Sequence, residues 1–315
     1  MQALILGNFD GVHLGHLALV AAAREAVGVT GSVRVLVLHP HPAEVLGRST
    51  YPRLTGLSER LERLLAGGVD HSGVLPVTPE FMATPPEAFL RELWLRERFD
   101  VLVEGPDFRF GLDRGGDLSL ARKVGEELGF IVVEVPEKVI DIATNVSIAP
   151  RSSVIRRELA SGNLEVAARL LGRSCGIRGV VQRGAGQARL LGWPTANIDP
   201  AGLCVPPVGV FAGAGRPVGA PTWHPAAIHL GPRPSQPGLG DSLEAVLLGV
   251  DALPLQSAAG LVPAVGEYGW SLELQFHRRL RDIKKFSDVG ALQAQIREDA
   301  RLAVAQFGAR CSIAP

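Results

Sequence analysis

Short apolar runs alternate with amphipathic segments through the first 135 residues. Five apolar runs predict buried strands at residues 3–7, 33–38, 73–77, 100–105 and 130–135. Apolar residues at helical spacing predict helices between them, at 14–27, 57–67, 86–98 and 117–129. This alternation predicts an α/β fold, in which helices cover both faces of a parallel sheet. Two short helices, at 152–161 and 163–171, are expected to follow.

The pattern changes after about residue 175. Residues 176–280 are rich in Gly and Pro, and their short apolar runs predict strands at 176–182, 209–213, 226–231, 243–250 and 270–276. Without a convincing helix among them, these strands predict a small antiparallel barrel or sandwich. The chain then predicts a final amphipathic helix, capped by Ser287 or Asp288. We therefore expect two domains, residues 1–173 and 174–315.

Composition narrows the possible partners. The chain has 315 residues, is 46% hydrophobic and carries no net charge, so it lacks the electrostatic signature of a nucleic-acid or anionic-membrane binder. Its most apolar long window, 245–265, contains charged and proline residues and is a poor membrane span. Three scattered cysteines and the absence of a signal-type start favour a reducing, cytoplasmic location. We expect neither nucleic-acid nor membrane partners, and the oligomeric state stays open.

The segment GNFDGVHLGH, residues 7–16, combines a turn with the start of a helix. The first strand is expected to end at Gly7, and Gly11 permits backbone geometry closed to other residues. The first N–H groups of a helix beginning near Leu14 would suit a phosphate. His13 and His16 would share its first turn, donate to phosphate oxygens and stabilise a leaving pyrophosphate. The alternative is a pair of surface or capping histidines.

One segment of the first half suggests contacts with a planar ring. In GPDFRFG, residues 105–111, Phe108 and Phe110 can wall a planar ring, Asp107 can hold its polar edge and Gly111 permits close approach. The alternative is a surface loop anchored by its aromatic side chains.

The segment PRSSVIRREL, residues 150–159, predicts a second phosphate contact at a helix start. Ser152, Ser153 and the amides of the first turn can hold phosphate oxygens, and Arg156 can pair with them bidentately. The alternative is ordinary serine capping beside a solvated arginine.

The segment LLGWPTANI, residues 190–198, offers hard oxygen ligands. The Thr195 hydroxyl and the Asn197 carboxamide suit Mg²⁺, while Pro194 stiffens the loop and Gly192 leaves room for phosphate. A plain β-turn is the alternative for this short segment.

Taken in order, these motifs resemble those of the bacterial bifunctional riboflavin kinase/FAD synthetase family over nearly the full length. Residues 7–16 resemble the H-x-G-H signature of nucleotidylyltransferases, and residues 105–111 and 150–156 resemble that family's G-x-D-F-x-F-G and I-S-S-T-x-I-R segments. Residues 190–198 contain a segment similar to the G-x-P-T-A-N motif of riboflavin kinases. Residues 243–248 resemble the strand that carries the kinase glutamate, here Glu244.

The resemblance implies a Rossmann-like nucleotidylyltransferase domain followed by a riboflavin kinase β-barrel with a C-terminal helix. The implied reactions are phosphorylation of riboflavin to FMN and adenylylation of FMN to FAD, with ATP as co-substrate and Mg²⁺ as cofactor. Glu244, His13, His16 and Arg156 would be catalytic. The implied binding residues are Gly7, Asn8, Phe9, Gly11, His13, His16, Ser152, Ser153, Arg156, Gly192, Pro194, Thr195 and Asn197 for ATP and phosphate, Asp107, Phe108, Phe110 and Gly111 for flavin, and Thr195 and Asn197 for Mg²⁺.

Several positions depart from the family pattern, among them Ser153 and Ser235, which each stand in place of a threonine. His39 replaces an acidic residue, Arg151 a serine, His229 an asparagine and Val246 a histidine; an insertion also occupies residues 251–265. These departures leave three alternatives open: a single retained activity, a non-catalytic flavin- or nucleotide-binding regulator, or a nucleotidylyltransferase for another phosphate ester.

Overall fold

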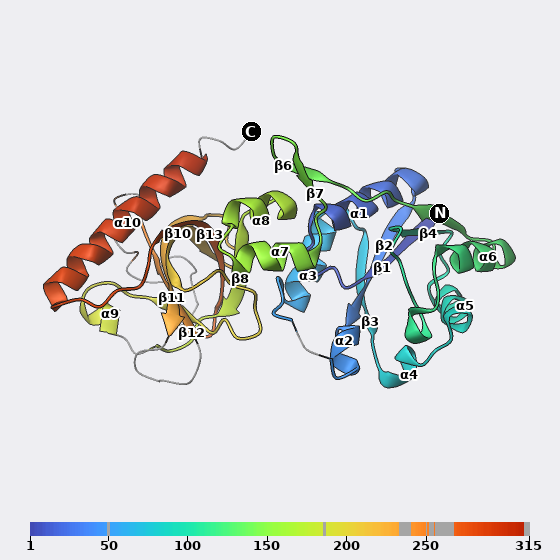
Figure 1. Ribbon diagram of the computed structural model, residues 1–315, viewed down its shortest axis with the longest axis horizontal. Coiled ribbons are helices and arrows are strands. Elements are labelled where there is room, and N and C mark those ends of the chain that lie inside the picture. The colour runs from blue at the N-terminus through green and yellow to red at the C-terminus, as the bar shows by residue number, and fades with distance from the viewer. Residues whose placement is uncertain are drawn as a thin grey trace. The chain divides into compact units, whose positions relative to one another are not determined.

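The computed structural model describes residues 1–48, 51–184, 187–232, 241–249, 251, 255 and 268–311. Its contacts divide the chain into two compact units. The first comprises Met1–Ser152 and Leu170–Gly172, and the second comprises Ser153–Arg169 and Arg173–Pro315. The domain boundary expected between residues 173 and 174 stays a prediction. Each unit is described by itself below, with the labels of Figure 1.

The first unit contains a five-stranded parallel sheet of order β3-β2-β1-β4-β5. Its strands are β1 (Gln2–Gly7), β2 (Ser32–His39), β3 (His71–Pro76), β4 (Val101–Glu104) and β5 (Ile131–Glu134). All five coincide with the apolar runs of the sequence, so the expected α/β fold is confirmed.

Helices cover both faces of this sheet. Ala3 and Ile5 of β1 pack in one core with α1 (Leu14–Val27) and α3 (Leu57–Ala66). Leu4 and Leu6 face the opposite core, with α5 (Pro86–Glu97) and α6 (Leu118–Leu128). Because successive side chains of a strand point to opposite faces, a strand buried on both sides is apolar throughout.

The second unit contains a six-stranded sheet of order β8-β13-β10-β11-β12-β9, with every pairing antiparallel. Its strands are β8 (Cys175–Val180), β9 (Ala196–Ile198), β10 (Gly209–Pro217), β11 (His224–Pro232), β12 (Asp241–Leu247) and β13 (Ser271–Arg281). The two outer strands approach each other where Gln182 N–H donates to the Asn197 carbonyl at 2.8 Å. The expected small antiparallel barrel is therefore confirmed.

The C-terminal helix α10 (Val289–Cys311) packs on β10 and β11 of this barrel (Figure 1). Asp288 caps it by accepting from the Ala291 N–H at 2.8 Å. Of the two capping residues that the sequence offers, Asp288 makes this bond. The helices expected at 152–161 and 163–171 form as α7 (Ser152–Ala160) and α8 (Leu164–Leu171).

Several short elements carry no pattern long enough to detect. They are α2 (Pro42–Val45), α4 (Pro79–Met82), η1 (Leu112–Arg114), the hairpin β6 (Ile140–Ala143) and β7 (Val146–Ile148), α9 (Gln187–Leu190) and β9. The one-turn helix α9 interrupts residues 176–280, where the sequence predicted no helix. A single turn shows no helical periodicity, and local capping, such as the His41 side chain before α2, is enough to define it.

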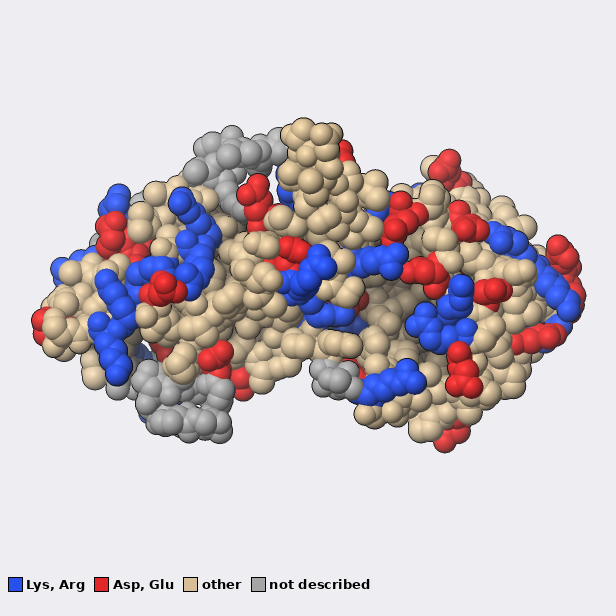
Figure 2. Space-filling model, viewed as in Figure 1, with Lys and Arg blue, Asp and Glu red and all other residues tan. Residues whose placement is uncertain are grey.

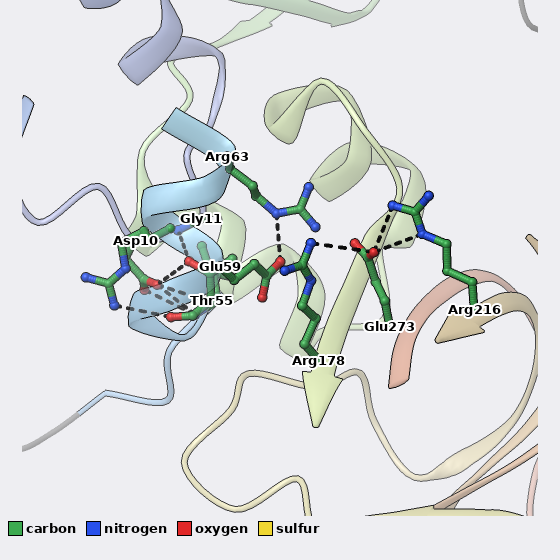
Figure 3. A network of polar contacts seen from close by, with 10 residues as sticks. Asp10, Gly11, Thr55, Glu59, Arg63, Arg178, Arg216 and Glu273 are labelled. Atoms are coloured by element: carbon green, nitrogen blue, oxygen red, sulfur yellow. Dashed lines mark hydrogen bonds and ion pairs between the residues drawn. The ribbon is translucent and has the colours of Figure 1, made fainter. Parts of the chain in front are cut away.

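An ion-pair row centred on a buried glutamate crosses three neighbouring strands of the barrel. Glu273 of β13, 4% exposed, accepts from Arg216 of β10 at 3.0 Å and lies 3.6 Å from Arg178 of β8 (Figure 3). The three residues are register partners, so their side chains share a face of the sheet. Arg216 also stacks over Trp223, 4.4 Å from its ring centroid.

Acidic and basic side chains are interspersed on the face of the described residues that Figure 2 shows. Within the described part of the chain, no helix combines the length and apolar character needed to cross a membrane.

Candidate active sites

The first candidate site lies where the strand order of the parallel sheet reverses. β1 and β4 are neighbours at the centre of the sheet. From β1 the sheet continues to β2 on one side, and from β4 it continues to β5 on the other side. Open α/β sheets bind ligands at the carboxyl ends of strands at such a switch point. The loops that leave those ends contain residues 8–13 and 105–111, so the topology brings together two segments about 100 residues apart.

The turn after β1 has an unusual backbone. Phe9, Gly11 and Val12 have φ angles of 49°, 86° and 40°. Left-handed φ in non-glycine residues is uncommon and costs energy, and it concentrates at functional sites. Gly7 leaves room for the Phe9 ring, because a Cβ at this position would lie 3.2 Å from that ring and the ring would have to shift. The turn therefore depends on this particular sequence.

The two histidines form a reciprocal cap on α1. The Nδ1 atom of His13 accepts from the backbone N–H of His16, and Nδ1 of His16 accepts from that of His13, both at 3.3 Å. Their rings stack, with centroids 3.6 Å apart. Because both Nδ1 atoms accept, each neutral ring carries its proton on Nε2. Capping, the alternative left open by the sequence, is confirmed, and it also fixes both rings as oriented Nε2–H donors.

Asp10 fixes the shape of this turn. Its buried carboxylate accepts from the backbone N–H groups of Leu54 at 3.0 Å and Thr55 at 3.1 Å, while Gly11 N–H donates to the Thr55 hydroxyl at 2.9 Å (Figure 3). Sequence reasoning gave Asp10 no role. The sequence signal that could have identified it is an acidic residue in an apolar turn that contains glycine. A carboxylate buried there needs hydrogen-bond donors from elsewhere in the chain.

Ser152 contacts the same turn. Its hydroxyl donates to the Asp10 carbonyl at 2.8 Å, so the first residue of α7 lies at the H-x-G-H segment. Ser153 and Arg156 follow on α7. Arg151 pairs with Glu137 and lies 3.6 Å from Asp107, and its side chain is 52% exposed.

The 105–111 loop is anchored by one of its aromatic residues. Phe110 is 6% exposed and packs against Phe89, with centroids 5.7 Å apart. Phe108 lies 5.1 Å from Phe110 and is less buried, whereas Asp107 is exposed. Gly111 has φ 71°, and a Cβ there would meet Pro86. The anchoring that the sequence left open as an alternative is therefore present, and the flavin contacts stay a prediction.

Glu104 is a buried acid that sequence reasoning missed. It ends β4, is 3% exposed and accepts from the backbone N–H of Leu6 in β1 at 2.8 Å. Burial raises the pKa of Glu104 well above its ordinary value, with a smaller contribution from Asp107. The sequence signal that could have identified Glu104 is an acidic residue directly after three apolar strand residues.

His39, which departs from the family pattern, ends β2. Burial lowers the pKa of His39, and the nearby Arg53 and Arg60 lower it further. Burial and these two arginines therefore favour the neutral imidazole, whereas Glu44 opposes that shift. Arg60 itself is 4% exposed and donates to the Asn8 carbonyl at 2.7 Å.

The second candidate site is a cavity of about 670 Å³ in the barrel unit. Its lining includes residues from β9, β11, β12, β13 and α10. Several positions that the sequence singled out separately share this lining: Thr195, Asn197, His229, Glu244 and Val246. Arg281 of β13 also lines the cavity. Arg278 and Arg279, the other arginines of the last strand, are exposed and lie outside the lining.

Five lining residues form one row across the sheet. Strand register pairs Asn197 with Glu244, Glu244 with His229, His229 with Val210, and Val210 with Arg281. Directly opposed residues point to the same face, with Cβ atoms about 5 Å apart. The row therefore brings the acid, the carboxamide, the imidazole and the guanidinium to one wall of the cavity.

Thr195 and Asn197 fit the Mg²⁺ chemistry expected of them. The Asn197 Nδ2 donates to the Thr195 hydroxyl at 3.3 Å, which holds the two side chains together. A Cβ at Gly184 would lie 2.4 Å from the Asn197 amide, so glycine keeps this space open. Among the described residues, no three His, Cys, Asp or Glu side chains gather as a metal site. Two neutral oxygens suit an ion whose other ligands are water and phosphate.

The loop before β9 contains Gly192 and Pro194. Gly192 has φ 83°, a backbone conformation that favours glycine. Neither residue lines the cavity, whereas the neighbouring Trp193 does.

The cavity also contains an ion pair. Arg281 binds Asp299 of α10 through two nitrogens, with Nη2 to Oδ2 at 2.7 Å, and Asp299 is 5% exposed. Residues 233–240 lie outside the described residues, as does the 251–265 insertion apart from Asp251 and Leu255.

Comparisons with known proteins agree over both halves of the chain. Residues 1–148 match the family model of FAD synthetase, and residues 171–307 match that of riboflavin kinase. The chain is similar to proteins named bifunctional riboflavin kinase/FMN adenylyltransferase. It is 32% identical to that of Escherichia coli K12 and 28% identical to that of Bacillus subtilis 168, in each case over 97% of this chain and 92% of the relative.

A solved structure described as a macrolide-efflux protein from Streptococcus pneumoniae has the same fold. Its TM-score is 0.77, and the match covers 96% of this chain and 93% of that chain at 22% identity.

Proposed function

The chain belongs to the bifunctional riboflavin kinase/FMN adenylyltransferase family, and from that premise we propose that it phosphorylates riboflavin to FMN and then adenylylates FMN to FAD. ATP is the second substrate of both reactions. The observation that carries this proposal is the cavity row, which joins Glu244 to Asn197 in a pocket that also contains Thr195.

In the kinase reaction, the riboflavin 5′-hydroxyl attacks the γ-phosphorus of ATP. The new O–P bond forms as the bond to the bridging oxygen of ADP breaks. Glu244 accepts the hydroxyl proton, since its carboxylate faces the cavity from the middle of β12. Thr195 and Asn197 would hold Mg²⁺, which supplies charge neutralisation for the phosphates when bound.

In the adenylylation reaction, an FMN phosphate oxygen attacks the α-phosphorus of ATP and pyrophosphate leaves. The nucleophile is already an anion, so positioning and charge stabilisation carry the rate. The oriented Nε2–H groups of His13 and His16 are the proposed donors to the phosphates. Ser152, Ser153 and Arg156 contribute further phosphate contacts, and Asp107, Phe108, Phe110 and Gly111 flank the flavin.

The remaining expectations belong to the same proposal. The domains divide near residue 173, and the enzyme works in the cytoplasm on small molecules alone.

A product time course tests the proposal. Purified protein receives riboflavin, ATP and Mg²⁺, and flavins are separated by HPLC with fluorescence detection. FMN should appear first and then be replaced by FAD. FMN that accumulates without FAD would overturn the adenylylation half, and point to the Arg151 region. FAD made from added FMN but not from riboflavin would overturn the kinase half, and point to His229 and Val246.

Glu244→Gln provides the matched test of the kinase site. Amide for carboxylate removes the base while keeping the shape, so FMN formation should fall roughly 100-fold or more. FAD formation from added FMN in the same preparation serves as the internal control. Undiminished FMN formation would refute the role of Glu244.

A further inference from the structure

The barrel cavity contains an imidazole beside the proposed base. His229 of β11 is the register partner of Glu244 in β12, and both residues line the cavity. Directly opposed side chains in an antiparallel pair lie close enough to interact. His229 is half-buried, so its interactions are less screened than those of a surface histidine.

Among the described residues of this face, two polar neighbours of Glu244 hydrogen-bond to other groups, and a third neighbour is apolar. The Asn197 amide nitrogen donates to Thr195 at 3.3 Å. Ser242, two residues before Glu244 on the same face, donates to the Gly231 carbonyl at 3.4 Å. Val246, two residues after it, is apolar. His229 is therefore the neighbour in this row whose N–H is suited to hold the carboxylate.

Burial of His229 favours its neutral form. Burial lowers its pKa, and Arg281 of β13 lowers it further, while Glu244 of β12 and Asp299 of α10 oppose that shift. Its partner on β10, Val210, carries no charge. A neutral imidazole carries one donor and one acceptor, so it can hydrogen-bond a carboxylate without neutralising the charge that makes it a base.

We propose that His229 is a positioning residue of the kinase reaction, whose neutral imidazole orients the Glu244 carboxylate toward the riboflavin hydroxyl. This inference rests on the proposed kinase function. Protonation of His229 would create an imidazolium–carboxylate pair and reduce the basicity of Glu244. FMN formation should therefore decline as the pH falls through the pKa of His229.

Two substitutions separate positioning from packing. His229→Ala removes the imidazole and should lower kcat for FMN formation roughly 10- to 100-fold, with little change in KM for ATP or riboflavin. His229→Asn keeps an uncharged N–H donor that does not titrate. It should recover most of the kcat lost in His229→Ala, and its acid limb should move to lower pH than that of the unsubstituted protein.

The experiment measures total FMN plus FAD formed from riboflavin, from pH 5 to pH 9, with full-length protein. His224→Asn is the matched control, because His224 is also partly buried on β11 but lies outside the cavity lining. Its acid limb should stay where it is. FAD formation from added FMN reports the integrity of each preparation.

The outcomes are distinct. The inference is overturned if His229→Ala keeps kcat within twofold, or if the acid limb of His229→Asn coincides with that of the unsubstituted protein. If His229→Ala does not fold, the acid limb of His229→Asn alone decides. Full FMN formation by Glu244→Gln would instead mean that the proposed kinase mechanism has failed.

Discussion

Single side chains at the first site have more than one task. The Nδ1 atoms of His13 and His16 satisfy backbone donors at the start of α1, a helix without an acidic residue in its first turn. That same arrangement assigns the ring protons to Nε2. Stability and catalysis are therefore linked in this pair, and an experiment has to separate them.

His16→Ala tests the pair. Loss of one phosphate donor should lower FAD formation from FMN about 100-fold and leave FMN formation nearly intact. Loss of the cap should cost about 1 kcal/mol of stability, which thermal unfolding would detect. If the histidines only cap the helix, the melting temperature falls while FAD formation at low temperature is unchanged.

Glu104→Gln tests the buried acid. The raised pKa favours the protonated form of Glu104 in the folded protein over a pH range in which this residue is ionised in the unfolded chain. Its contribution to stability is thus present below the ordinary pKa and is lost as the pH rises through the folded pKa. Glutamine keeps an acceptor for Leu6 N–H and does not ionise.

The variant should therefore unfold at a higher temperature than the unsubstituted protein at pH 8, with the difference vanishing toward pH 4. Glu134→Gln, at the exposed end of β5, is the control and should show no such trend. A difference in melting temperature that does not depend on pH would contradict the assignment.

At the scale of elements, α10 lines the cavity with Leu292, Ile296 and Asp299, and Asp299 is the charged residue among them. Asp299 binds Arg281, the last residue of the five-residue row, and thereby connects the helix to β13. Arg281 is the more exposed partner, with 21% of its side chain accessible, against 7% for Asp299.

Asp299→Ala should destabilise the protein by about 2 kcal/mol, since it leaves a partly buried guanidinium without its carboxylate. FMN formation should fall with it, because Arg281 loses its fixed position. Glu298→Gln, the neighbouring exposed residue paired with Arg301, should change neither measurement. Equal effects of the two substitutions would argue that the helix acts through its charge alone.

At the scale of the whole molecule, the two proposed reactions are assigned to different parts of the chain, and each compact unit has its own sheet. A mixture of His16→Ala and Glu244→Gln proteins should consequently convert riboflavin to FAD, since FMN made by the first reaches the second through solution. Neither protein alone should do so at a comparable rate. Failure of the mixture, with each remaining activity intact, would mean that FMN is not released.

The sequence by itself determined the fold class of both halves of the chain and the order of its motifs. Apolar runs buried on two faces identified the five parallel strands, and helical spacing identified the longer helices, because these patterns are local along the chain. The same locality explains why one-turn elements such as α9 escaped notice. It also explains why Glu244 and Asn197 could be named from motifs before their contact was known.

Only the tertiary structure decided which groups meet. The pairing of His229 with Glu244 depends on strand register, and the burial of Glu104 beside Leu6 depends on two strands 98 residues apart in sequence. The Asp10 contacts with Leu54 and Thr55 likewise join distant loops. Periodicity shows which face of an element is buried, but not what lies opposite it. The protonation and orientation of side chains in these sites depend on the groups that lie opposite them in the folded protein.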